Sequence, residues 1–443
     1  MATDYNLTIV GDSYTLSSVG GSTILSGRLR DYSAFKPQVL GPVTPPNPYA
    51  LANFVFLGDN TPQAGATFTL ERAAIVQNTN PQVPQPDLLL RNSGSGEVRI
   101  LGLSQNQIAN SESIQTTGGA VVNPAADWKL VTGKADVNGD GIRDLVWFNS
   151  TSGESAIWYM QKGNTGLSNI IGSASLLYLP NAQTSFKVGQ GWQLTAVEDF
   201  LGDSRPEFLW EERNSGSTAI WKLDIASNGR TDLNLAGSSF VTFNGATIQT
   251  GGTAAGWRIA GVGNFTVNSS AKNLLWFNEN TSETAVWQLD GTALVGSGFV
   301  NFQGTSLKPV GWKPVAVGNL DGVGPDEIVW QNGTAVAVWN LGSNYGVTDR
   351  SVVLSQGLAA GEQVQALADL NLDGSLDLVV RQKASDVSGI PIYYLNKTTF
   401  QLTTPIQFLV QPPATTAYST GDRRFDIIDA VDLGGPLVTL NLG

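Results

Sequence analysis

Short apolar runs alternate with turns along most of the chain. Residues 145–148 and 155–159 are two such runs, and both are rich in residues that favour β-strands. The polar residues between them, 149–153, end in Gly, which is typical of a β-hairpin turn. No long segment has the period of a helix, and no apolar run approaches the roughly 20 residues of a membrane span. The pattern predicts an all-β fold without a membrane-spanning helix.

Tryptophan marks a repeat of this hairpin. The 12 Trp fall into four triplets, namely Trp128, Trp147 and Trp158; Trp192, Trp210 and Trp221; Trp257, Trp276 and Trp287; Trp312, Trp330 and Trp339. The first gap is 18 or 19 residues and the second is 11, except for 9 in the last triplet. Removing two residues leaves every strand side chain on its original face. The spacing therefore predicts a repeated unit, as in propellers and solenoids.

Three further units keep this frame without the Trp. Residues 366–380 continue it, with 392–394 as a third strand, and residues 425–433 match residues 257–265 position by position. An upstream unit carries a long insertion that we expect to be a surface loop; its parts are residues 49–54, 86–90 and 97–100.

Seven anchor residues count the units: Asn53, Asp136, Asp199, Asn264, Asn319, Asp369 and Asp432. Their separations are 83, 63, 65, 55, 50 and 63 residues, and a four-stranded propeller blade fits in about 50 to 65 residues. We therefore expect an all-β β-propeller of seven four-stranded blades. Rings of six or eight blades are the alternatives.

The last anchor lies 11 residues before the C-terminus, so the final blade needs strands from elsewhere. Residues 5–10 and 22–25 are strand-like, and we expect them to close the ring in one shared blade, which would remove the open sheet edge. The expected single domain, residues 1–443, then divides into outer strands of the closing blade (1–41), a blade with the insertion (46–110), five further blades (125–180, 190–245, 255–305, 310–355 and 360–411) and inner strands of the closing blade (422–443).

Composition removes several classes of function. The chain has no Cys and no His, which excludes catalysis by Ser-His-Asp or Cys-His and every zinc site that needs those ligands. The net charge is −12, which argues against a nucleic-acid partner. Absence of Cys is compatible with an exported bacterial protein, although no basic stretch followed by an apolar core is visible near Met1.

Two units carry a loop of alternating oxygen ligands. The first offers the side chains of Asp136, Asn138, Asp140 and Asp144 with the carbonyl of Ile142; the second offers Asp369, Asn371, Asp373 and Asp377 with the carbonyl of Ser375. Such ligands suit Ca²⁺, which takes six to eight oxygens and tolerates irregular geometry. A loop of Asx-type turns that needs no metal is the alternative.

An Asp-x-Asn-x-Asp-Gly-x-x-Asp loop that precedes a short apolar strand, repeated around a ring, resembles the FG-GAP (VCBS-type) repeats. These form the β-propellers of integrin α-chains and of many bacterial surface proteins. The resemblance implies that the ten residues of the two strict loops bind Ca²⁺. The other loops depart from it: Asp199, Asp203 and Glu207 keep positions 1, 5 and 9, and Asn319, Asp321 and Glu327 keep positions 1, 3 and 9. The motif is lost after Asn264 and Asp432.

Two features could serve a ligand more directly. The Trp could be sugar-stacking platforms, with the third-strand Trp the better candidates for exposure, but their regular spacing favours packing between strands. The acid pair Glu211 and Glu212 could serve glycosidic chemistry, which needs two convergent carboxylates. Adjacent strand residues point to opposite faces, so this pair is not expected to converge.

We therefore expect a non-enzymatic, calcium-stabilised propeller that is secreted or on the cell surface. Its expected partner is a protein or a glycan, in adhesion, a matrix or a surface assembly, with self-assembly left open; no nucleic-acid partner is expected. A lectin with a sugar site in each blade and a glycan-active hydrolase are the two alternatives.

Overall fold

The computed structural model describes strands 5–10, 13–18, 23–28 and 66–70. It then describes residues 87–409, except 105–106, 165–166, 227–228, 267–271, 383–389 and 404–406, and finally strand 425–431. The chain divides into two compact bodies, residues 1–83 with 436–443 and residues 84–435. The described residues contain no α-helix, and none of their helical segments is long and apolar enough to cross a membrane. The predicted all-β fold is confirmed.

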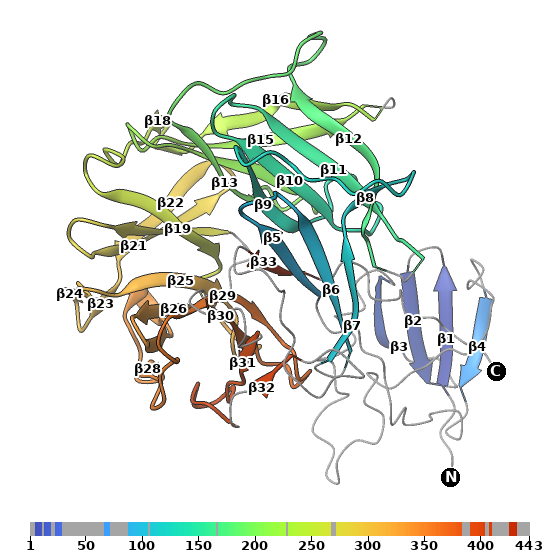
Figure 1. The fold of residues 1–443 in the computed structure, drawn as a ribbon. Coiled ribbons are helices and arrows are strands. Elements are labelled where there is room, and N and C mark those ends of the chain that lie inside the picture. Colours follow the sequence, from blue (N-terminus) through green and yellow to red (C-terminus); the bar gives the residue numbers. More distant parts are fainter. Residues whose placement is uncertain are drawn as a thin grey trace. The chain divides into compact units, whose positions relative to one another are not determined.

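Within its described residues, the larger body contains six antiparallel repeats of four strands, two of which are joined by a parallel pairing at their outer edges (Figure 1). Repeat 1 contains β33 (Phe425–Val431), β5 (Asp87–Asn92), β6 (Val98–Ser104) and β7 (Gln107–Ser113). Repeat 2 contains β9 (Trp128–Ala135), β10 (Asp144–Asn149), β11 (Ser155–Gln161) and β12 (Ile170–Tyr178). Repeat 3 contains β13 (Trp192–Glu198), β14 (Glu207–Glu212), β15 (Thr218–Ile225) and β16 (Thr231–Phe240).

Repeats 4 to 6 follow the same plan. Repeat 4 contains β19 (Trp257–Gly263), β20 (Asn273–Asn278), β21 (Thr284–Asp290) and β22 (Ala293–Phe299). Repeat 5 contains β25 (Lys313–Gly318), β26 (Glu327–Asn332), β27 (Ala335–Trp339) and β28 (Val352–Val353). Repeat 6 contains β29 (Glu362–Ala368), β30 (Asp377–Gln382), β31 (Pro391–Tyr393) and β32 (Gln407–Phe408).

Five of the six neighbouring pairs of first strands lie side by side. Contacts join β33 to β9, β9 to β13, β19 to β25, β25 to β29, and β29 back to β33. Between repeats 3 and 4, the main-chain N–H of Ile259 in β19 donates to Glu211 in β14. Within the described residues, the six repeats therefore follow one another around a closed path.

Five of the six first strands carry the same irregularity, and the pairing of β9 in repeat 2 has two register shifts. The pairing with the second strand shifts register between Leu194 and Ala196 in repeat 3, and equivalent shifts occur at Ile259/Gly261, Pro314/Ala316, Val364/Ala366 and Ile427/Asp429. A β-bulge bends a strand and increases its twist, which is what a curved inner strand needs. The bulge in β33 confirms the predicted match of residues 425–431 to residues 257–263.

The predicted closure is wrong in its partners. The C-terminal strand β33 pairs with β5, with Ile427 opposite Leu90, and so completes the repeat of residues 87–113. The N-terminal strands pair among themselves instead: β1 (Tyr5–Val10) lies between β2 (Ser13–Ser18) and β4 (Ala66–Leu70), and β3 (Thr23–Arg28) lies beside β2.

The expected seven blades are consequently not confirmed, because two incomplete units are one. Residues 87–92 are buried along the whole strand and need a partner on the inner side, and β33 fills that place. The segment expected there, residues 49–54, lies outside the described residues. Closure by strands from distant parts of the chain still removes an open sheet edge, but it yields six repeats in the described part of the larger body.

The second-strand Trp form the centre of the core. Trp147, Trp210, Trp276 and Trp330 are at most 1% exposed. Each stacks on the half-buried third-strand Trp of its own hairpin, with ring centroids 4.5 to 4.8 Å apart. Trp210 also meets Phe148 of the neighbouring repeat edge-to-face at 5.3 Å. The expectation that the Trp are a packing frame is confirmed for the second-strand Trp.

Candidate functional site

Four of the loops between first and second strands share one backbone conformation. Their fourth and sixth residues are all left-handed, with φ between 60° and 85°: Gly139 and Gly141, Gly202 and Ser204, Gly322 and Gly324, Leu372 and Gly374. Non-glycine residues seldom adopt this conformation. The loops therefore keep their shape even where Ser or Leu replaces Gly.

Loop 136–144 is organised around the carboxylate of Asp136. Its Oδ1 accepts hydrogen bonds from the N–H groups of Gly139 (2.7 Å) and Asp140 (3.2 Å), and its Oδ2 accepts one from Gly141 (2.9 Å). The amide of Asn138 donates to Asp140 at 2.9 Å. The ligands predicted at positions 1, 3 and 5 thus lie in one exposed turn.

Loop 369–377 repeats this arrangement. Asp369 accepts from the N–H groups of Asp373 (3.0 Å) and Gly374 (2.9 Å), and the amide of Asn371 donates to Asp373 at 3.1 Å. The N–H of Ser375 donates to Asp373 at 2.8 Å. The two loops that the sequence analysis singled out are therefore structurally equivalent.

The acid at position 9 is buried rather than exposed. In Asp144, Oδ2 accepts from the N–H of Val137 (2.8 Å) and Oδ1 from that of Met160 (3.0 Å); Asp377 does the same with Leu370 (3.2 Å) and Leu395 (3.0 Å). Burial raises the pKa of both carboxyls to about 7, and the neighbouring loop acids contribute in the same direction. These acids join the loop to the second and third strands.

The donor sets of the two strict loops fit Ca²⁺ in chemistry. They combine carboxylate, amide and main-chain carbonyl oxygens, and within the described residues no Lys or Arg forms an ion pair with their acids. Each carboxylate oxygen keeps lone pairs beyond its hydrogen bonds to main-chain N–H groups. A divalent cation would also relieve the repulsion among the loop acids, which adds to the larger effect of burial on the pKa of Asp144 and Asp377.

Carboxylates converge most closely in a different loop. Across the described residues, the acidic group that brings one ligand atom from each of three residues within 4.8 Å is Asp199, Asp203 and Glu207. The three acids of each strict loop are not so close. In sequence the Asp199 loop is incomplete, because Leu201 replaces the ligand at position 3 and Ser204 replaces the Gly at position 6.

Basic side chains pair with the two degenerate loops. Lys222 in β15 forms an ion pair with Asp203, and Arg350 forms one with Asp321 at 2.5 Å. In repeat 4, where the motif after Asn264 is lost, the main-chain N–H of Asn264 donates to Asp326 of the next repeat at 2.8 Å. The sequence did not predict a role for Lys222 or Arg350. The available signal for Lys222 was its position directly after Trp221, the third-strand Trp of repeat 3.

A shallow groove lies at the outer edge of repeat 4. It consists of two adjoining hollows of about 330 and 450 Å³ that share Ser297, Asn344 and Tyr345. Tyr345 belongs to the short 3-10 turn η4 (Ser343–Tyr345), in which Asn344 and Tyr345 have φ of 55° and 57°. Two successive non-glycine residues in this region indicate backbone strain.

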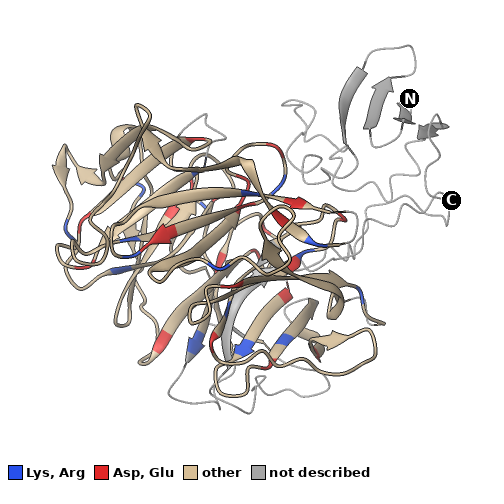
Figure 2. Ribbon diagram, turned by 90° about the horizontal axis from the view of Figure 1, so that it is seen from above, with Lys and Arg blue, Asp and Glu red and all other residues tan. Residues whose placement is uncertain are grey.

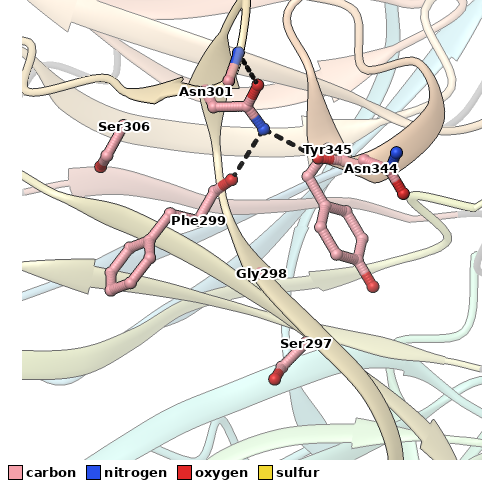
Figure 3. Close-up of a pocket in the computed structure, with 8 residues that line it drawn as sticks. Ser297, Gly298, Phe299, Asn301, Ser306, Asn344 and Tyr345 are labelled. Atoms are coloured by element: carbon pink, nitrogen blue, oxygen red, sulfur yellow. Dashed lines mark hydrogen bonds between the residues drawn. The ribbon is translucent and has the colours of Figure 1, made fainter.

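Contacts with repeat 4 hold this turn in place. The amide of Asn301 donates to the carbonyls of Phe299 (3.1 Å) and Asn344 (2.8 Å) (Figure 3). A Cβ at Gly298 would lie 2.7 Å from the Tyr345 ring, so glycine is needed there for the ring to approach β22. The two hollows are lined by aromatic, hydroxyl and amide groups and by no Asp, Glu, Lys or Arg.

The acid pair considered for glycosidic chemistry does not converge. Glu211 is fully buried and faces the boundary with repeat 4, whereas Glu212 is half-buried and caps the turn through Ser215, whose N–H donates to it at 2.7 Å. Figure 2 shows acidic and basic residues interspersed along the described strands and loops.

No family model matches the chain, and no curated protein matches it. Among solved structures, the Photorhabdus luminescens Tc holotoxin pore (TccC3-D651A) is 16% identical over 68% of this chain, with a TM-score of 0.40. Apo AztD from Citrobacter koseri is 10% identical over 80% of this chain and 96% of its own, with a TM-score of 0.30. The extracellular domain of a putative one-component system of B. thetaiotaomicron is 9% identical over 76% of this chain and 35% of its own, with a TM-score of 0.30. This chain spans 13% of the toxin chain.

Proposed function

We propose that residues 84–435 form a six-bladed β-propeller that acts by binding, without catalysis. Its partner is a protein or a glycan at the cell surface or in an extracellular assembly. Ca²⁺ bound by loops 136–144 and 369–377 stabilises the ring. The proposal keeps the kinship to FG-GAP repeats as an interpretation of the loop motif, with six blades in place of seven.

The uncharged groove beside Tyr345 is the observation that carries the binding function. A chain of net charge −12 presents there a surface of aromatic rings, amides and hydroxyls. Aromatic faces stack on apolar faces of sugars or side chains, while amides and hydroxyls bind neutral polar groups. The groove therefore favours a neutral ligand, namely an uncharged glycan or peptide segment.

Two matched phenylalanines test this proposal. Phe299 lines the groove and is 48% exposed; Phe240 occupies the equivalent place in repeat 3 and is 44% exposed. Each ring lies about 6 Å from the first Trp of its repeat. On an array of neutral glycans and uncharged peptides, Phe299→Ala should weaken the retained ligand about tenfold, and Phe240→Ala should not. Equal losses of affinity in the two variants, or no ligand retained by the native protein, would contradict binding in the groove.

A thermal melt tests the metal. A ligand that binds only the folded state raises its melting temperature. We expect the native protein to melt at a lower temperature in EGTA than in millimolar Ca²⁺, and Mg²⁺ to substitute poorly because it demands near-octahedral geometry. Identical melting curves with and without Ca²⁺ would argue against bound metal in either strict loop.

A hydrolase is the less supported alternative. Glu211 and Glu212 lie on opposite faces of β14. The lectin alternative with one site in each blade is less supported, because each third-strand Trp is half-buried against the second-strand Trp of its own hairpin.

A further inference from the structure

Lys222 is built into repeat 3 so that its ammonium meets the loop of the same repeat. It follows Trp221 in β15 and pairs with Asp203, 19 residues earlier. Its main-chain N–H donates to Ser238 Oγ at 3.0 Å, and its aliphatic stem passes over Gly237 of β16. A Cβ at Gly237 would lie 2.6 Å from Lys222 Cδ, so the neighbouring strand leaves room for this side chain.

The ammonium pairs with Asp203, one of three carboxylates that lie close together. Asp199, Asp203 and Glu207 bring one ligand atom each within 4.8 Å of one another. Glu207 is fully buried; its Oε2 accepts the N–H groups of Phe200 (2.9 Å) and Leu201 (3.1 Å), while its Oε1 has no hydrogen-bond partner. Closely spaced ionised acids with a buried, unpartnered oxygen are unfavourable unless a nearby positive charge or a bound proton compensates them.

In repeat 5, a basic side chain from a different element pairs with the loop acid. Asp321 is 2% exposed and pairs with Arg350, which lies 29 residues later in the connection that leads to β28. The Arg350 guanidinium also lies 5.1 Å from the centre of the Phe400 ring in repeat 6. Two unrelated positions thus supply a cation to the two loops with incomplete ligand sets, and within the described residues the two strict loops have none.

We propose that Lys222 occupies, in repeat 3, the cation position that Ca²⁺ takes in loops 136–144 and 369–377. The native loop 199–207 is then free of metal, and removing the ammonium converts it into a Ca²⁺ site formed by Asp199, Asp203 and Glu207. The inference deepens the proposed function and rests on its calcium loops.

Lys222→Met in the full chain tests this inference, since it keeps an apolar stem and removes the charge. Calorimetric titration should show one more Ca²⁺ bound per chain than in the native protein. The variant should melt below the native protein in EGTA, and millimolar Ca²⁺ should raise its melting temperature by about 3–5 °C more than that of the native protein. Lys308→Met, which breaks an ion pair with Glu283 away from these loops, is the control and should gain no metal.

An unchanged metal count and Ca²⁺ response in Lys222→Met would overturn the inference. If that variant does not fold, Asp199→Asn decides: the native loop holds no metal, so the Ca²⁺ count should stay the same, and loss of one ion would overturn the inference. Failure of the strict loops is distinguishable, because the native protein would then bind no Ca²⁺ while Lys222→Met could still gain one.

Discussion

The buried carboxylate of Glu211 accepts a hydrogen bond from the main-chain N–H of Ile259 at 3.3 Å, across the boundary between repeats 3 and 4. Gln331 has the equivalent role between repeats 5 and 6, where it accepts from Val364 at 3.0 Å and donates to the carbonyl of Glu362 at 2.8 Å. The bonded N–H belongs to the residue just before the bulge in both first strands. A polar side chain at this place therefore joins neighbouring repeats.

Glu211→Gln should stabilise the protein at pH 7 by about 1 kcal/mol, because the amide oxygen can still accept the hydrogen bond from Ile259 and no buried charge remains. Burial raises the pKa of Glu211, while Arg213 and Arg258 partly oppose this. Protonated Glu211 therefore stabilises the native state most at pH values below its pKa in the unfolded chain. This contribution is lost as the pH rises through its pKa in the folded protein. The gain should be small at pH 4 and grow towards pH 8 in thermal melts. Gln331→Glu should have the opposite effect, and a Glu211→Gln variant that melts lower at pH 7 would refute the argument.

Asp144 and Asp140 should separate structure from metal binding. Asp144→Ala leaves two buried N–H groups unpaired, so we expect a loss of about 2–4 kcal/mol in EGTA as well as in Ca²⁺. Asp140 is exposed, and Asp140→Ala should cost less than about 1 kcal/mol in EGTA and abolish the response of its loop to Ca²⁺. Urea unfolding with and without Ca²⁺ measures both. Equal losses in EGTA would show that the position-9 acid has no special structural role.

Leu372 and Ser204 offer stabilising substitutions. Both are left-handed, with φ of 60° and 66°, so replacement by Gly should relieve about 1 kcal/mol of strain. Gly374→Ala is the reverse control: φ is 84° and nothing lies within 4 Å of an added Cβ, so any loss reports the backbone conformation alone. In chemical denaturation, the free energy of unfolding should rise for Leu372→Gly and Ser204→Gly and fall for Gly374→Ala. Destabilisation by Leu372→Gly would mean that the leucine side chain contributes more than the strain removes.

The two Trp of one hairpin should differ in their contributions. Trp210 is fully buried and contacts Phe148 and Trp221, so Trp210→Ala should cost about 3–5 kcal/mol. Trp221 is half-buried, so Trp221→Ala should lower the free energy of unfolding clearly less. Urea titrations compare them, and similar losses would contradict the view that the second-strand Trp form the core.

Gly298→Ala tests the groove without removing a ligand-binding group. The added Cβ would meet the Tyr345 ring at 2.7 Å, so the ring must move away from β22. We expect ligand binding to fall at least fivefold while the melting temperature changes little, because the groove is at the surface. Gly304→Ala is unsuitable as a control because its φ is 82°; Gly189→Ala, where an added Cβ meets nothing within 4 Å and which does not line the groove, is the better one.

Local patterns in the sequence determined much of this protein. Trp spacing located four hairpins, and the positions of Asp136 and Asp369 located two equivalent loops. The match of residues 425–431 to residues 257–263 identified β33 as a first strand. These features are readable because strand periodicity, turn chemistry and repetition act over a few residues and recur in each repeat.

Only the tertiary structure decided which segments complete one another. Several apolar strands could have lain beside β33, and the pairing of Ile427 with Leu90 depends on burial and register between segments more than 300 residues apart. Lys222 and Arg350 reach the loop acids of their own repeats from different elements, so no short motif connects them. The groove at Tyr345 likewise exists because Gly298 and Asn301 of one repeat meet a strained turn of the next. Such contacts depend on how the chain packs in three dimensions, which spacing along the sequence does not record.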